Sequence, residues 1–153
     1  MITEVPQVDS MTCDECEVIR VVIVDDREAM REGLRLMLSG DESIRVVGVA
    51  RDGQQALAKV EKLSPDIVLL DIATSAMGVI EVTRSIKEAQ PHVSIIILND
   101  SRRHLASAIK AGAVGFLART IGRDELIAAI RLIYLWRLVL FNGNKGQCAL
   151  VKL

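Results

Sequence analysis

Short apolar runs and longer amphipathic segments alternate along this chain from residue 19 to about residue 141. The apolar runs have the length and the β-branched composition of buried strands. Each segment between them repeats its apolar side chains with the spacing of a helix that lies on a sheet. The predicted strands, in chain order, are 19–24, 44–50, 67–71, 93–98 and 114–117.

The predicted helices follow these strands in turn. The first spans 27–38, the second starts after Asp52-Gly53, and the third runs through Val79 and Ile86. A fourth covers 102–111, with Gly112 as its C-terminal cap, and the last begins near residue 123. Continuously apolar strands that alternate with helices indicate an α/β fold, in which a parallel sheet is covered on both faces.

Polar side chains stand where several of the predicted strands end. Asp25 and Asp26 follow the first strand, Asp71 ends the third, Asn99 follows the fourth and Arg119 follows the fifth. In an open parallel sheet the ligand or reaction site lies beyond the carboxyl ends of the strands. We therefore expect these side chains to gather around one site.

Three carboxylates at one edge of a sheet repel one another unless a cation lies among them. The oxygens of Asp26 and Asp71, with a backbone carbonyl just past Asp71, suit Mg²⁺, which prefers oxygen ligands and keeps several waters. Such a metal can also stabilise a phosphoryl group that passes onto a carboxylate. A lone aspartate at a strand end could simply cap a helix, but an Asp pair followed by Asp71 is a more specific pattern.

Five stretches of the chain carry motifs in a fixed order: VVIVDDREAMREGLRLML (21–38), VVGVARDGQQAL (46–57), PDIVLLDI (65–72), EVTRSIKEAQPHVSIIIL (81–98) and AIKAGAVGFLART (108–120). In these stretches the sequence resembles the receiver domains of two-component response regulators, particularly the LuxR/NarL/FixJ-type branch with helix-turn-helix outputs. The resemblance covers residues 19 to about 135. It implies a flavodoxin-like (CheY-like), doubly wound sheet of five parallel strands in the order 2-1-3-4-5.

The resemblance also implies roles for individual residues. Asp71 is the position at which a phosphoryl group from a sensor histidine kinase would be accepted. Asp26 would bind Mg²⁺ (or Mn²⁺) directly, Asp25 would act mostly through water, and the backbone carbonyl of Ala73 would complete the protein ligands. Phe116 takes the position of the aromatic switch residue.

The sequence departs from the family at the residues that read out phosphorylation. Asn99 stands where the family places a Ser or Thr, and Arg119 stands where it places a Lys. Asn can donate a hydrogen bond to a phosphoryl oxygen, and Arg keeps the positive charge, but its planar fork differs from a flexible ammonium. The segment between Asn99 and Phe116 is about two residues shorter than in the family, and Thr74-Ser75-Ala76 replace its usual Met-Pro-Gly.

These departures leave two interpretations open. The chain is either a receiver that accepts a phosphoryl group, or a pseudo-receiver that signals through protein contacts without phosphoryl chemistry. A small enzyme or a cofactor binder on the same fold is disfavoured, because Arg27-Glu28-Ala29 stands where a Gly-rich phosphate-binding loop would follow the first strand. We therefore expect a signalling domain and no enzyme.

Composition and charge agree with one domain of ordinary type. The 153 residues carry a formal net charge of −1, which gives no general attraction to nucleic acid or to anionic membrane. Residues 1–18 hold several acidic side chains and no Lys or Arg, so they are expected to form a mobile tail before a receiver domain over 19–141. The start of the chain lacks the pattern of a signal peptide, which makes the cytoplasm the expected location.

The segment 126–141 is apolar nearly all round and is interrupted only by Arg131 and Arg137. It is a poor candidate for a membrane span, which needs about 20 residues with few charges. One sheet face cannot bury all its apolar side chains, so the surplus is expected either to form a homodimer surface or to be covered by the extension 142–153. The surplus side chains are Leu135, Trp136, Val139 and Leu140. No recognition helix fits into that extension, so we expect no direct nucleic-acid contact from this chain.

Overall fold

The structure, a computed structural model, describes residues 18–71 and 78–141, with side chains up to residue 138. Residues 1–17 of the predicted tail, the predicted extension and Ala73 lie outside the described residues. Five parallel strands form one sheet in the order β2-β1-β3-β4-β5, which confirms the predicted flavodoxin-like topology. The strands are β1 (Ile19–Asp25), β2 (Ile44–Ala50), β3 (Ile67–Asp71), β4 (Ser94–Leu98) and β5 (Gly115–Leu117).

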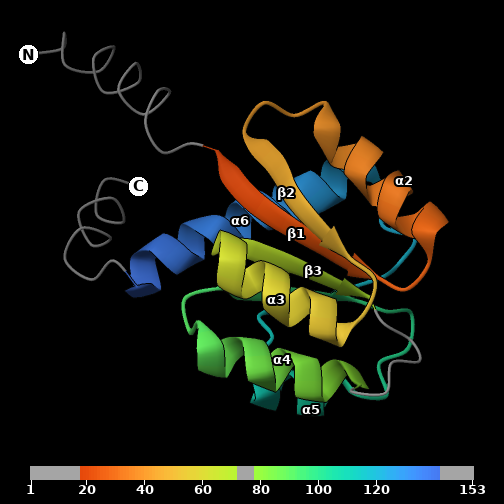
Figure 1. The fold of residues 1–153 in the computed structure, drawn as a ribbon. Coiled ribbons are helices and arrows are strands. Elements are labelled where there is room, and N and C mark those ends of the chain that lie inside the picture. Colours follow the sequence, from red (N-terminus) through yellow and green to blue (C-terminus); the bar gives the residue numbers. More distant parts are fainter. Residues whose placement is uncertain (1–17, 72–77, 142–153) are drawn as a thin grey trace, which may run out of the picture.

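Five helices cover the two faces of this sheet (Figure 1). They are α2 (Glu28–Ser39), α3 (Gly53–Leu63), α4 (Gly78–Ala89), α5 (Leu105–Ala111) and α6 (Arg123–Phe141). Apolar side chains of α3, α4 and α5 form a buried core on one face. Those of α2 and α6 form a second core on the other face, as continuously apolar central strands require.

The structure departs from the predicted element bounds mainly around α5. The sequence predicted a helix over 102–111, whereas α5 starts only at Leu105. The physical reason is the side chain of Asn99, whose Oδ1 accepts a hydrogen bond of 2.9 Å from the amide of Ser101. This contact holds the chain after β4 in a turn, which competes with helix formation. Strands β4 and β5 each start one residue later than predicted, and β1 extends to Asp25.

The two arginines that interrupt the apolar sequence of α6 bind groups outside this helix. The guanidinium of Arg137 lies 3.3 Å from the carboxylate of Asp66 and donates a 2.8 Å hydrogen bond to the carbonyl of His92. Arg131 forms an ion pair of 2.5 Å with Asp41. Both arginines therefore tie the helix to loops between elements of the sheet and its covering helices.

Apolar side chains also remain on the outer side of α6. The inward side buries Leu126, Ile127 and Ile130 against the sheet. In contrast, Leu135 is 37% exposed and Trp136 is 57% exposed, so the sheet does not bury them, as the sequence predicted. The side chains of Val139 and Leu140 lie outside the described residues. Within the described residues, no helix is both long enough and apolar enough to cross a membrane.

Two glycines provide a matched test of this backbone. Gly112 caps α5 with φ of +118°, and a Cβ built there would lie 2.7 Å from Cγ of Lys87. Gly33 lies inside α2, and a Cβ there would meet no atom within 4 Å.

We expect Gly112→Ala to lower the free energy of unfolding by about 1–2 kcal/mol, because an L-residue is strained in this conformation. Gly33→Ala should instead raise it by about 0.5–1 kcal/mol, because Ala loses less entropy in a helix. Urea denaturation of both variants measures the two changes. Equal effects in both variants would contradict the assigned backbone conformations.

Candidate functional site

Two buried carboxylates lie side by side at the carboxyl edge of the sheet. Asp25 ends β1 and Asp71 ends β3, and the two residues face each other in the register of the parallel ladder. Their side chains are 0% and 1% exposed, respectively. Carboxylates removed from water in this way require charged or hydrogen-bonding partners.

The guanidinium of Arg27 is the first of these partners. Its Nε lies 3.2 Å from Oδ1 of Asp25, and its Nη2 lies 3.3 Å from Oδ2 of the same carboxylate. The same Nη2 donates a 3.0 Å hydrogen bond to Oδ2 of Asp71. Its Nε is also 3.8 Å from Oδ1 of Asp26, whose side chain is partly exposed. One guanidinium therefore contacts all three carboxylates.

The local backbone holds Arg27 in this place. The amide of Arg27 donates a 2.8 Å hydrogen bond to Oδ1 of Asp25, and Arg27 itself is the N-cap residue of α2. Its carbonyl accepts the amide of Arg31 at 3.0 Å, which starts the helix. Arg31 in turn donates from Nη1 to the backbone carbonyl of Asp25 at 2.8 Å. The end of β1 and the start of α2 are thus joined around the carboxylate of Asp25.

Arg119 is the second partner of Asp71 and comes from the chain just past β5. Its Nε and Nη2 lie 3.0 and 2.8 Å from Oδ1 of Asp71. Its amide donates a 3.0 Å hydrogen bond to Oδ1 of Asp100, which anchors the backbone. Both oxygens of Asp71 therefore accept from arginine, one from Arg27 and the other from Arg119.

Burial and the two arginines act in opposite directions on the pKa of Asp71. The pKa is raised from 3.8 to about 6, first by burial and then by the neighbouring Asp25, although Arg119 and Arg27 act to lower it. The pKa of Arg27 is raised, chiefly by its hydrogen bond to Asp25. The arginine therefore keeps its positive charge, and Asp71 takes up a proton more easily than an ordinary carboxylate does.

The other residues predicted for the site lie close to this edge but are engaged differently. The side-chain oxygen of Asn99 accepts from the amide of Ser101, as described above. The amide of Asn99 donates to the carbonyl of Leu117 at 2.8 Å, which joins the end of β4 to the end of β5. Phe116 is partly buried and packs against the core under α3, α4 and α5.

The described residues do not fit a divalent cation in the arrangement that they adopt. Within the part of the chain that the structure describes, no group of three or more His, Cys, Asp or Glu side chains is arranged to hold a metal ion. The carboxylates of Asp25, Asp26 and Asp71 have the oxygen chemistry that Mg²⁺ prefers. However, their shared neighbour is an N–H donor of Arg27, and a bound cation would need that guanidinium to leave.

Arg27 is the site residue that the sequence analysis did not identify. It was considered only as evidence against a Gly-rich phosphate-binding loop. The sequence did contain a signal for this role. An arginine that directly follows an Asp pair at the end of β1 is within reach of the carboxylates that end β1 and β3.

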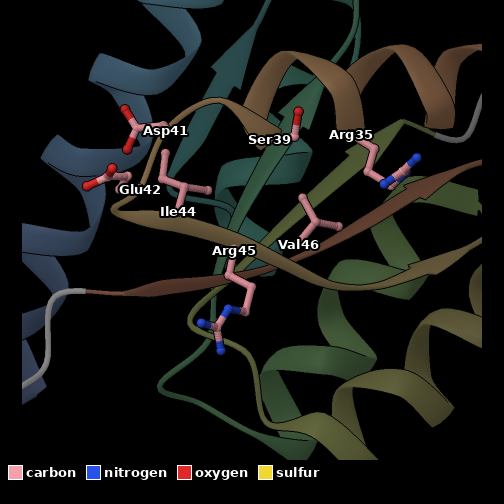
Figure 2. Close-up of a pocket in the computed structure, with 7 residues that line it drawn as sticks. All are labelled: Arg35, Ser39, Asp41, Glu42, Ile44, Arg45 and Val46. Carbon is pink, nitrogen blue, oxygen red and sulfur yellow. The ribbon is translucent and has the colours of Figure 1, made fainter.

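A hollow of about 310 Å³ lies elsewhere, between the end of α2 and the edge strand β2 (Figure 2). It contains none of the residues of the carboxylate site. Its lining side chains come from α2, from the turn that follows it and from β2: Arg35, Ser39, Asp41, Glu42, Ile44, Arg45 and Val46.

The raised pKa of Asp71 predicts how stability depends on pH. The favourable contribution of protonated Asp71 is fully present below its unfolded pKa and is lost as the pH rises through about 6. Asn does not ionise, so the Asp71→Asn variant does not lose this contribution as the pH rises. The free energy of unfolding of the variant, relative to wild type, should therefore grow by up to about 3 kcal/mol between about pH 4 and about pH 7. Urea denaturation in EDTA measures this difference, and a value that stays constant with pH would contradict the assignment.

Comparison with known proteins places this chain in a family. The sequence model of the response regulator receiver domain family matches residues 21–131 of this chain. Response regulator GacA of Pseudomonas viridiflava is 32% identical over 118 residues, which cover 76% of this chain and 55% of GacA. Transcriptional regulatory protein DegU of Brevibacillus brevis is 32% identical over 117 residues, covering 75% of this chain and 50% of DegU. The chain thus spans about half the length of the curated relatives it matches.

A solved structure of a receiver domain is also similar to this chain. The signal receiver domain of NarL from Mycobacterium tuberculosis is 30% identical, with a TM-score of 0.72, and the match covers 78% of this chain and 98% of that domain. The receiver motifs predicted from the sequence are therefore confirmed by family, by curated relatives and by fold. This chain belongs to the response regulator receiver domain family.

Proposed function

We propose that this receiver domain accepts a phosphoryl group on Asp71 from a sensor histidine kinase in the cytoplasm. Receiver domains take part in two-component signalling. Asp71, the acceptor in this proposal, ends β3. The observation that supports the proposal is the contact of both Asp71 oxygens with guanidinium groups. Positive groups at these oxygens can stabilise the charge of a phosphoryl group during transfer.

In the proposed transfer, Asp71 is the nucleophile and the imidazole of the kinase is the leaving group. One Oδ atom of the ionised Asp71 forms a bond to phosphorus while the bond between phosphorus and the imidazole nitrogen of the kinase breaks. The electron pair of that bond stays on the imidazole nitrogen, which takes up a proton. Arg119 and Arg27 donate hydrogen bonds to the Asp71 oxygens. Their N–H groups are therefore close enough to donate to the phosphoryl oxygens as negative charge develops there.

Access to Asp71 depends on these arginines. The carboxylate is buried, whereas the side chain of Arg119 is 24% exposed and that of Arg27 is 44% exposed. The guanidinium groups therefore form the solvent side of the site, and their outward movement would open an oxygen of Asp71 to a phosphodonor. In the proposal, this movement precedes transfer.

A second function is favoured by a specific observation. Both oxygens of Asp71 are already satisfied, and the side chain of Asn99 is turned to the backbone of Ser101. A site closed in this way suits a pseudo-receiver, which acts as a phosphorylation-independent interaction module. The two functions differ in one measurable property, the acceptance of a phosphoryl group by Asp71.

Intact-protein mass spectrometry after incubation with Mg²⁺ and acetyl phosphate separates the two functions. The proposed receiver should gain the mass of one phosphoryl group, because acetate leaves as its P–O bond breaks and an Asp71 oxygen bonds to phosphorus. Asp71→Asn should show no gain, and Asp124→Asn, which changes an exposed carboxylate on α6 away from the site, should still show it. No gain in wild type with any phosphodonor would exclude the receiver chemistry and leave the interaction module.

We further propose that the chain forms a homodimer through α6. Leu132, Leu135 and Trp136 are exposed on the outer side of this helix, where the sheet does not bury them. Exposed aromatic and aliphatic side chains that lie close together are typical of protein–protein contacts.

Trp136→Ser should weaken self-association at least about tenfold, because a large central aromatic side chain dominates such a contact. Leu36→Ser is the matched control, because Leu36 is similarly exposed but lies on α2. Light scattering over a concentration series measures both. A wild-type protein that stays monomeric at the highest concentration would contradict the dimer.

A further inference from the structure

We propose that the guanidinium of Arg27 is a built-in counter-cation that takes the place of a divalent metal among Asp25, Asp26 and Asp71. The inference deepens the receiver function proposed above, because it concerns the control of the same acceptor site. It follows from a mismatch in this chain: three carboxylates with the oxygen chemistry that Mg²⁺ prefers lie at one edge of the sheet, but one guanidinium of the protein contacts all three.

The contacts of Arg27 cover the inner oxygens of the site. Its guanidinium lies 3.2 and 3.3 Å from the two oxygens of Asp25 and 3.0 Å from Oδ2 of Asp71. A cation bridging Asp25 and Asp71 would need these same oxygens and would lie against the guanidinium. At such short separation two like charges repel strongly, even when water screens part of the interaction. Metal and arginine are therefore alternatives in this site.

The charges of the site are already largely compensated without a metal. Three carboxylates face two guanidinium groups, those of Arg27 and Arg119. A divalent cation added to this set would bring more positive charge than the carboxylates need. The usual reason for a metal, repulsion between carboxylates that lack a counter-charge, is therefore weakened in this chain.

The position of Arg27 in the backbone keeps its positive charge beside the carboxylates. Its amide is bound to Asp25, and its backbone starts α2, so the side chain begins beside the carboxylates that it contacts. The guanidinium stays charged at any pH at which the protein is folded. Because the side chain is 44% exposed, it can still move outward, and a metal would have to displace it rather than enter a free site.

The inference predicts that the site becomes a divalent-cation site once Arg27 loses its charge. In Arg27→Ala and in Arg27→Gln, Mn²⁺ should bind at least about tenfold more tightly than in wild type. Gln keeps much of the length of the side chain without the charge, so it serves if the Ala variant does not fold. The matched control is Arg35→Ala, because Arg35 also lies on α2 but pairs with Glu32, outside the carboxylate cluster.

Mn²⁺ binding is measured by electron paramagnetic resonance of the free ion, with no phosphodonor present. Wild type and Arg35→Ala should bind Mn²⁺ weakly and equally. Adding Asp26→Asn to Arg27→Gln should reduce the affinity again, which assigns the bound ion to this carboxylate cluster. Mg²⁺ should compete with Mn²⁺ in the Arg27 variants.

Two results would overturn the inference. One is an equal Mn²⁺ affinity in wild type and in the folded Arg27 variants, and the other is a gain in affinity that survives Asp26→Asn. Since no phosphoryl donor is used, these results are separate from the fate of the proposed function. Failure of Asp71 to gain a phosphoryl mass would overturn the receiver chemistry while leaving the metal measurement to decide on Arg27.

Discussion

The arrangement of this domain depends on how two buried carboxylates are neutralised where β1 and β3 end. Asp25 and Asp71 lie opposite each other in a parallel ladder and are removed from water. A charged carboxylate that is removed from water is costly unless positive groups pair with it. Arg27 and Arg119 supply those partners from the start of α2 and from the end of β5. The ion pairs thereby join three strands and a helix at the edge where receiver domains carry their acceptor.

Most of the fold was predictable from the sequence, because the strands of a covered parallel sheet are read directly from apolar runs. The runs at 44–50 and 67–71 coincide with β2 and β3, and Asp52 accepts the amide of Gln55 at the start of α3, where a turn was predicted. The start of α5 was predicted three residues too early. That error arose because the turn depends on one side-chain contact, from Asn99 to Ser101, which periodicity does not reveal.

The candidate site was predictable in its composition but not in its internal pairing. Topology alone brings Asp25, Asp71 and Arg119 to one edge, since each follows or ends a strand of the sheet. The requirement for a cation among the carboxylates was also inferred from charge. The sequence analysis named Mg²⁺ as that cation and did not consider Arg27, because the contacts of this guanidinium depend on its rotamer, and spacing along the sequence carries no information on rotamers.

An arginine in the place of a metal would change what controls the acceptor. A metal ion enters and leaves with its concentration, whereas a guanidinium on the backbone of α2 is always present and leaves only by moving aside. Movement of Arg27 would then couple the exposure of Asp71 to the start of α2, because the same residue caps that helix. The unusual Arg119 would act in a similar way from β5, since it holds the other oxygen of Asp71.

The central claim is the location of the positive charge between Asp25 and Asp71, and a crystal grown with Mn²⁺ tests it most directly. Anomalous scattering locates the metal independently of any interpretation of the side chains. The account predicts no manganese peak among the three carboxylates and a guanidinium of Arg27 within hydrogen-bonding distance of both buried ones. A manganese peak bound to Asp26 and Asp71, with Arg27 turned to solvent, would contradict it.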